Sequence, residues 1–117
     1  MIEKFEDLKV WLLSIELTTD ISKIFSLSKD FGLKDQICRS AVSIASNIAE
    51  GFERNYNKEY IRFLRIAKGS GGELRTQIYI ARNIGYLNTD SFEDLLNRSS
   101  HISSMLSNLI KIREEKF

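Results

Sequence analysis

The sequence predicts an all-α protein, folded as an antiparallel four-helix bundle that runs up, down, up and down. Apolar residues recur at helical spacing along four long segments of the 117-residue chain, and only a few residues separate one segment from the next. The chain contains no proline, which would cost about 3 kcal/mol inside a helix. Helices joined by such short links must run antiparallel, so we expect a single four-helix domain over residues 1–117.

The first two helices are expected over residues 7–28 and 33–52. The first carries two apolar rows, which indicates that it touches neighbours on two sides. Gly32 can adopt the left-handed backbone that follows a helix, so we expect the first break to close there. The second helix is apolar around most of its circumference, with Arg39 as the one charge in its middle, and should be the most enclosed. Gly51 is its expected stop.

The third and fourth helices are expected over residues 58–84 and 90–115. Asp90 followed by Glu93 has the spacing of a capping box, so the fourth helix should begin there. The third helix carries a seam at alternating spacings of three and four, which is typical of a helix that packs closely along a partner. The seam consists of Tyr60, Leu64, Ala67, Gly71, Leu74, Ile78, Ala81 and Gly85.

Three glycines, Gly69, Gly71 and Gly72, interrupt the third helix, and each costs about 1 kcal/mol relative to alanine in a helix interior. Close helix packing would offset that cost. A break in the helix at the glycines is a second interpretation. A phosphate-binding loop is a third, but the sequence has neither a preceding strand nor the Lys-Ser/Thr pair that such loops require.

Composition and charge exclude several classes of protein. The formal net charge is +1, so the overall charge indicates no partner, and any electrostatic signal must be local. Cys38 is the single cysteine and cannot form an intrachain disulfide, and its apolar setting favours a small core residue. The N-terminal segment is charged early, and no apolar run approaches 18 residues. We therefore expect a cytoplasmic protein without a signal peptide or membrane contact.

A basic arc on the third helix is the main functional signal. Between residues 54 and 82 there are seven basic residues and two acidic ones, a local balance of +5 in a chain of net charge +1. Such a cluster is typical of a surface that contacts nucleic-acid phosphates. The alternative is a solvated helix face that pairs with acids of the fourth or the first helix, such as Glu93 and Asp94. The candidate nucleic-acid-binding residues are Lys58, Arg62, Arg65, Lys68, Arg75 and Arg82.

A polar cluster in the second helix needs partners if it is buried, because an unpaired buried polar group costs several kcal/mol. Arg54 and Ser70 are also near enough in the predicted fold to take part. We expect a structural polar network of Arg39, Ser43, Asn47, Glu50 and Glu73.

A catalytic carboxylate pair is the alternative use of that cluster. Glu50 and Glu73 could form one, with His101 as the only histidine in the chain. No nucleophile accompanies them, and metal sites in bundles use the Glu-x-x-His spacing that this sequence lacks. We therefore expect no catalytic residue, no metal site and no cofactor, and assign no enzymatic activity.

Four stretches carry a resemblance to a known family: FEDLKVW (5–11), GLKDQICRSAVSIASNIAEG (32–51), RFLRIAKGSGGEL (62–74) and IGYL (84–87). They resemble the small bacterial four-helix-bundle proteins encoded in intervening sequences of 23S rRNA genes. The accessory protein of diversity-generating retroelements is related to that family. The chain departs from the pattern at Ala45, where the family often has proline, and at Cys38-Arg39, which replaces a frequent Arg-Arg pair.

The resemblance implies a homopentamer with subunits side by side around an axis, and a basic surface that binds nucleic acid in the retroelement relative. It implies no enzymatic activity. We therefore expect a non-enzymatic homo-oligomer, most simply a pentamer, that binds RNA or DNA or acts as a scaffold through the basic arc. The alternative is a structural or protein-interaction module that binds no nucleic acid.

Overall fold

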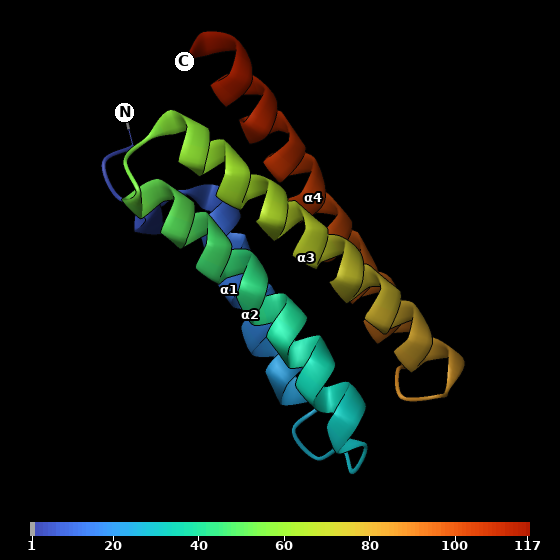
Figure 1. Ribbon diagram of the computed structural model, residues 1–117. Helices are drawn as coiled ribbons and strands as arrows, with labels where there is room; N and C mark the ends of the chain where they lie inside the picture. Colours follow the sequence, from blue (N-terminus) through green and yellow to red (C-terminus); the bar gives the residue numbers. More distant parts are fainter. Residues whose placement is uncertain (1) are drawn as a thin grey trace.

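The computed structural model describes residues 2–117 and contains four long helices (Figure 1). A short 3₁₀ helix, η1 (Phe5–Asp7), precedes α1 (Lys9–Ile24) and α2 (Phe31–Glu53). They are followed by α3 (Asn57–Asn83) and α4 (Thr89–Lys116), and the described part of the chain has no strand. The colours in Figure 1 show that successive helices run in opposite directions. The predicted all-α, up-down-up-down bundle is confirmed.

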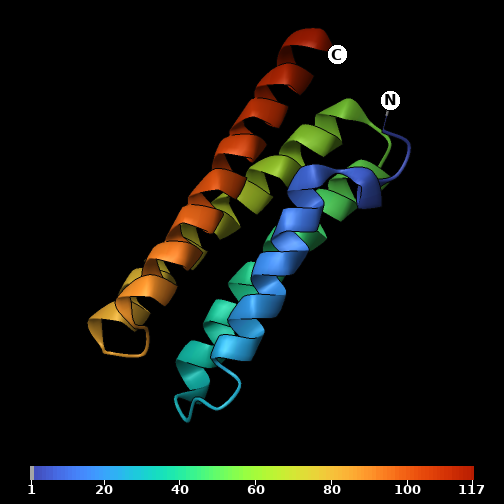
Figure 2. The same ribbon diagram turned by 180° about the vertical axis from the view of Figure 1, so that it is seen from behind.

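Within the bundle, each of the four helices packs against two neighbouring helices. α1 packs on α2, α2 on α3 and α3 on α4, and α1 also packs on α4, whereas within residues 2–117 no Cα atoms of diagonal helices come within 8 Å of each other. Figure 2 shows α1 and α4 together on the face that is hidden in Figure 1. The bundle measures 45 × 20 × 19 Å, which is close to the length expected for the 27-residue α3 at 1.5 Å per residue.

The core is aliphatic and receives side chains from all four helices. The predicted α3 seam faces it, and every seam residue is buried except Gly85, which lies beyond the helix with a positive φ of 87°. Among residues 2–117, no helix has both the length and the apolar character needed to cross a membrane. The largest fully enclosed side chains are Leu17, Ile21, Ile37, Ile44, Ile48, Leu64, Leu74, Ile78, Leu95, Ile102 and Leu106.

Two helix starts differ from the prediction because a different side chain caps them. Asp30 accepts a hydrogen bond from the Leu33 amide (3.1 Å), so α2 begins at Phe31. Gly32 therefore lies inside the first turn of α2 and does not close the preceding helix, which already ends at Ile24. The start of α4 is also earlier than predicted, because Asn88 accepts from the Ser91 amide (2.8 Å) in place of an Asp90–Glu93 box.

Gly51 does not stop α2, which continues to Glu53. A Cβ at Gly51 would lie 2.8 Å from the Phe63 Cβ and 3.2 Å from the Tyr60 carbonyl oxygen, so the missing side chain lets α3 approach. The chain turns instead at Asn55, whose φ is 52°.

α3 runs through its three glycines without a break. Close packing explains Gly71 alone, where a Cβ would lie 2.9 Å from the Ser103 Oγ of α4. A Cβ at Gly69 would meet nothing within 4 Å, and one at Gly72 would meet only the end of the Arg75 side chain. The structure gives no packing reason for these two glycines.

The expectation that α2 is the most enclosed helix is wrong, because α3 buries a larger share of its residues, nine of 27 against seven of 23. Val42 is 50% exposed, and Cys38 and Ala49 on the same side of the helix are only partly buried. α1 likewise buries one row of apolar residues and leaves Leu12 and Ile15 on the surface. Both helices therefore have an apolar outward face, because this arrangement of the helices leaves the outer side of each helix in solvent.

Candidate nucleic-acid interface

The six candidate basic residues lie on two adjacent strips of α3, Lys58, Arg62 and Arg65 on one and Lys68, Arg75 and Arg82 on the other. Lys58, Arg62 and Arg65 are exposed. Arg75 and Arg82 are partly buried because they reach other polar groups. Arg75 donates to the Ser103 Oγ of α4, and Arg82 donates to the Leu87 carbonyl and to Thr89 Oγ1, both at 2.8 Å. Lys68 is exposed and lies seven residues before Arg75 on the same line of the helix.

Two of the six charges already have acidic partners. Arg62 Nε lies 2.8 Å from Glu59 Oε2, and Arg65 of α3 pairs with Glu114 of α4. The hydrogen bond from Arg62 holds the pKa of the Glu59 carboxyl below its ordinary value, so Glu59 stays ionised. Both residues are therefore partly neutralised before any partner arrives.

The other four cations keep their charge without an acidic partner. Within residues 2–117, no carboxylate oxygen lies within 4 Å of the charged groups of Lys58, Lys68, Arg75 or Arg82. The bonds of Arg75 and Arg82 go to neutral oxygens, which position the guanidinium groups without cancelling their charge. We call Lys68, Arg75 and Arg82, spaced seven apart along α3, the basic line.

The predicted pairing with Glu93 and Asp94 does not form. Asp94 pairs with Arg98 of its own helix (3.3 Å), and Arg98 also reaches Asp20 of α1 (2.9 Å). Glu93 makes no ion pair with any residue that the structure describes. The acids of the first turns of α4 therefore do not compensate the basic line.

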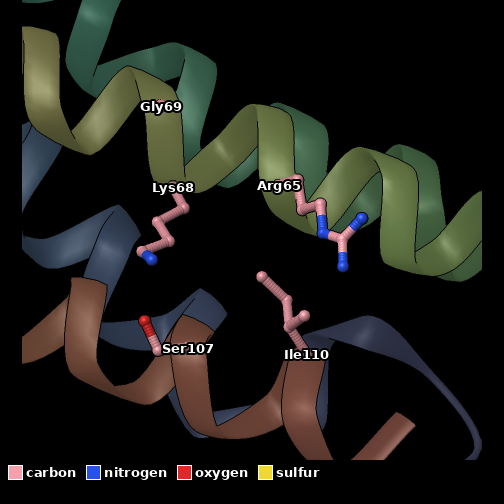
Figure 3. Close-up of a pocket in the computed structure, with 5 residues that line it drawn as sticks. All are labelled: Arg65, Lys68, Gly69, Ser107 and Ile110. Carbon is pink, nitrogen blue, oxygen red and sulfur yellow. The ribbon is translucent and has the colours of Figure 1, made fainter. Parts of the chain in front are cut away.

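A shallow hollow lies beside the basic line, between α3 and α4. Its volume is about 470 Å³, and Figure 3 shows Lys68 and Ser107 pointing toward each other across it. Gly69 contributes no side chain, Ile110 projects from α4 toward α3 as an apolar group, and Arg65 lines the same hollow (Figure 3). Hydroxyl and amide groups next to Lys and Arg are the usual donors to phosphate oxygens. α4 supplies such hydroxyl groups at Ser107, which lines the hollow with Lys68, and at Ser103, which contacts Arg75.

The predicted polar network is smaller than expected and links α2 to α3. The hydroxyls of Ser43 and Ser70 are 2.8 Å apart, and Asn47 Nδ2 donates to the Ser43 carbonyl (2.8 Å) and hydroxyl (3.0 Å). Ser70, which is buried on α3 one position before Gly71, was considered only as a possible partner. Its position beside the small-residue seam was the signal that could have placed it in the network.

Arg39, Glu50 and Glu73 do not belong to this network. Arg39 pairs with Asp35 (2.8 Å) and Glu50 with Arg54 (2.9 Å), in both cases at i, i+4 on the outer surface of α2. Glu73 is exposed and makes no side-chain hydrogen bond with residues 2–117. Charged groups find water or neighbours on their own helix at lower cost than a buried site would impose.

The register of α2 and α3 also separates the candidate catalytic carboxylates. Ser43 and Ser70 lie at the same level of two antiparallel helices. Glu50 lies seven residues beyond that level in one direction and Glu73 three residues in the other, which places them about 15 Å apart along the axis. His101 is exposed on α4. In the part of the chain that the structure describes, no three His, Cys, Asp or Glu residues come together as metal ligands would.

Comparison with known proteins identifies the family of this bundle and a similar solved structure. The sequence profile of the 23S rRNA-intervening sequence protein matches residues 6–108. The chain belongs to this family. No curated protein matches it significantly. Among solved structures, it is similar to a protein of unknown function from the S23 ribosomal protein family of Bacteroides thetaiotaomicron VPI-5482. The two share 26% identity over 87% of this chain and 98% of the other, with a TM-score of 0.82.

Membership of the 23S rRNA-intervening sequence family confirms the resemblance drawn from the sequence, and its profile includes the whole of α2 and α3. The basic line, the Ser43–Asn47–Ser70 network and the hollow apart from Ile110 therefore lie inside the matched residues 6–108. The related crystal structure is described as having unknown function, so any activity has to be argued from the site itself.

Proposed function

We propose that this member of the 23S rRNA-intervening sequence family is a non-enzymatic nucleic-acid-binding or scaffolding protein that acts as a homo-oligomer. The observation that carries the proposal is the basic line. Among residues 2–117, Lys68, Arg75 and Arg82 have no acidic partner. On α4, Ser103 accepts a hydrogen bond from Arg75, and Ser107 lines the same hollow as Lys68. These three cations supply positive charge but no arrangement of side chains suited to reading base edges. Contact with the phosphate backbone is therefore favoured over recognition of sequence.

The six predicted residues should contribute unequally. Lys68, Arg75, Arg82 and Lys58 can meet a phosphate directly, because none of them has to leave a carboxylate. Arg62 and Arg65 must exchange Glu59 and Glu114 for a phosphate, so their net contribution should be smaller.

Self-association would repeat the basic line in each subunit. Apolar groups on the outer faces of α1 and α2 support self-association. Leu12 and Ile15 of α1 are 45% and 39% exposed, and Val42 lies on the outer face of the adjacent α2. Residues three or four apart lie on one side of a helix, so these form apolar faces of the kind that mark protein contacts. We call Leu12, Ile15 and Val42 the α1–α2 apolar face. The number of subunits, five, rests on the family resemblance.

The test is a salt titration of binding to RNA and to duplex DNA. The logarithm of the affinity should fall linearly with the logarithm of salt concentration, by about 0.9 for each phosphate neutralised on a duplex. Substituting Lys68→Gln, Arg75→Gln and Arg82→Gln together should lower the slope by about that amount per residue.

A matched control removes the same charge from paired arginines. Arg39→Gln, Arg62→Gln and Arg65→Gln remove three charges that already have acidic partners, so binding should weaken much less. Equal losses in the two triple variants would show an effect of net charge alone and contradict the basic line as the site.

The second candidate function is a structural or protein-interaction module. The ion pairs Arg62–Glu59 and Arg65–Glu114 favour it, because they already use two of the candidate cations within the subunit. Absence of binding to both RNA and duplex DNA at low salt would reject nucleic-acid binding and leave this module as the function.

A further inference from the structure

A second cavity lies at the end of the bundle where the α2–α3 turn meets the N- and C-terminal segments. Figure 1 shows the turn and both chain ends at this end of the molecule. The cavity has a volume of about 400 Å³, within the range of about 300–1,000 Å³ that is typical of small-molecule sites. It shares no lining residue with the hollow beside the basic line. We call it the end cup, and the residues used below are Phe52, Tyr56, Tyr60, Ile112, Arg113 and Phe117.

The walls of the end cup are largely aromatic and aliphatic. Phe52 and Tyr60 meet edge to face at 5.8 Å and are held by the core, Tyr60 being buried. Tyr56, Ile112 and Phe117 are exposed at the rim, at 62%, 44% and 68% respectively. The exposed rings at the rim, beside the buried Tyr60, offer apolar surface to a flat ligand.

Arg113 is a fixed cation in this apolar setting. Its Nε donates to Asn57 Oδ1 (2.8 Å), while Asn57 Nδ2 donates to the Arg113 carbonyl (3.1 Å), so two reciprocal bonds tie α4 to the start of α3. The guanidinium carbon lies 5.1 Å from the Tyr60 ring centroid and 3.7 Å from that of Phe117. These contacts orient the group and leave its two terminal nitrogens as donors.

No carboxylate compensates this charge. None of the ion pairs formed by residues 2–117 includes Arg113, although neighbouring Glu114 is paired with Arg65. A guanidinium forms its strongest hydrogen bonds with an anion, and partial burial among apolar groups strengthens that preference. The end cup therefore presents one positive group beside a surface suited to an apolar body.

We propose that the end cup binds a small aromatic carboxylate, with the carboxylate on Arg113 and the ring system against Tyr60 and the rim aromatics. Charge complementarity selects the anion, since a neutral ligand would leave the Arg113 charge uncompensated. The aromatic lining selects a flat body, and the volume accommodates a molecule of about two fused rings. This site is separate from the basic line and does not depend on nucleic-acid binding.

The test uses 1-naphthoate as the probe and 1-naphthalenemethanol as its uncharged analogue, with binding to the full chain measured by calorimetry. We expect saturable binding of 1-naphthoate, about tenfold or more tighter than binding of the alcohol. Arg113→Gln should remove that difference. Arg98→Gln, the same change on the same helix outside the end cup, should leave it intact.

A second variant keeps the test decisive if Arg113→Gln destabilises the fold. Ile112 is half exposed at the rim, so Ile112→Trp should fold normally and fill the cavity, weakening both ligands. Circular dichroism confirms folding of each variant. Absence of saturable 1-naphthoate binding to the unmodified chain, or equal binding to the chain and Ile112→Trp, would overturn the proposal.

Discussion

At the scale of single residues, Gly51 sets the distance between α2 and α3. Gly51→Ala places a Cβ against Phe63 and the Tyr60 backbone, so the two helices must separate. We expect a loss of about 1–3 kcal/mol in the free energy of unfolding, as for other overpacked sites. Gly69→Ala is the control, since open space surrounds that position. It should stabilise the protein by about 0.5–1 kcal/mol through helix propensity. Urea denaturation measures both, and equal effects would contradict the close-approach explanation.

The Ser43–Asn47–Ser70 network is the residue-scale link between α2 and α3. Ser70→Ala leaves the Ser43 hydroxyl with Asn47 alone, and should cost about 1 kcal/mol of unfolding free energy. Ser46→Ala, on the exposed side of α2, should change stability by less than about 0.5 kcal/mol. A double-mutant cycle between Ser43→Ala and Ser70→Ala isolates the pair. Zero coupling would show that the hydrogen bond contributes nothing to stability.

Tyr60 makes stability depend on alkaline pH. Burial raises the pKa of its phenol, an effect that the positive charge of Arg113 partly offsets. A group whose pKa is higher in the folded state contributes stability that is complete below its unfolded pKa, near 10, and is lost as pH rises through the folded pKa. The temperature of half-unfolding should therefore decrease as the pH is raised beyond about 10, and it should decrease less in Tyr60→Phe. Identical pH profiles for the two proteins would exclude Tyr60 as the cause.

At the scale of the helices, the sequence predicts that a helix forms more securely than it predicts the residues at which that helix begins and ends. The presence of a helix depends on a periodic pattern summed over 16 to 28 residues, so no single residue can reverse the prediction. A helix end depends on which one of several adjacent polar residues turns back to the backbone. Asp30 and Asn88 do so here, where Gly32 and the Asp90–Glu93 pair were predicted. That choice reflects local backbone geometry, which the pattern of residue types does not contain.

The caps themselves can be tested. Asn88→Ala removes the acceptor for the Ser91 amide and should cost about 1 kcal/mol of unfolding free energy. Asp90→Ala should cost less, because Asp90 makes no capping hydrogen bond in α4 and only favours its N-terminus by charge. Thermal unfolding of the two variants distinguishes them. A larger loss in Asp90→Ala would restore the capping-box prediction.

The same limit applies to the candidate interface. The positions of the basic residues on α3 follow from helical spacing alone, and the structure keeps them there. Which of them are neutralised depends on contacts such as Arg65–Glu114, between residues 49 positions apart. Such a pair is fixed by the register of α3 against α4, which the packing of Gly71 on Ser103 helps to set. The sequence therefore predicts where the basic residues of α3 lie, but not which of them are paired with acidic side chains.

At the scale of the whole molecule, charge and association should be coupled. A single basic line offers about three phosphate contacts, which supports only weak binding at physiological salt. In the proposed oligomer, several copies would present their basic lines to one polyanion at high effective concentration, so affinity would rise steeply without any new kind of contact. The α1–α2 apolar face and the basic line lie on different helix pairs, so one can mediate association while the other stays accessible.

A charge placed on the α1–α2 apolar face tests this coupling. Val42→Glu should prevent the proposed self-association, because a carboxylate buried between subunits would be unpaired. Light scattering should then give the mass of a monomer. Binding of a long RNA should weaken by at least about 10²-fold as avidity is lost. Ser100→Glu, the same added charge on the outer face of α4, should leave the mass unchanged. The unmodified chain running as a monomer at micromolar concentration would refute the assembly, and a monomeric Val42→Glu that binds RNA undiminished would show that each bundle acts alone.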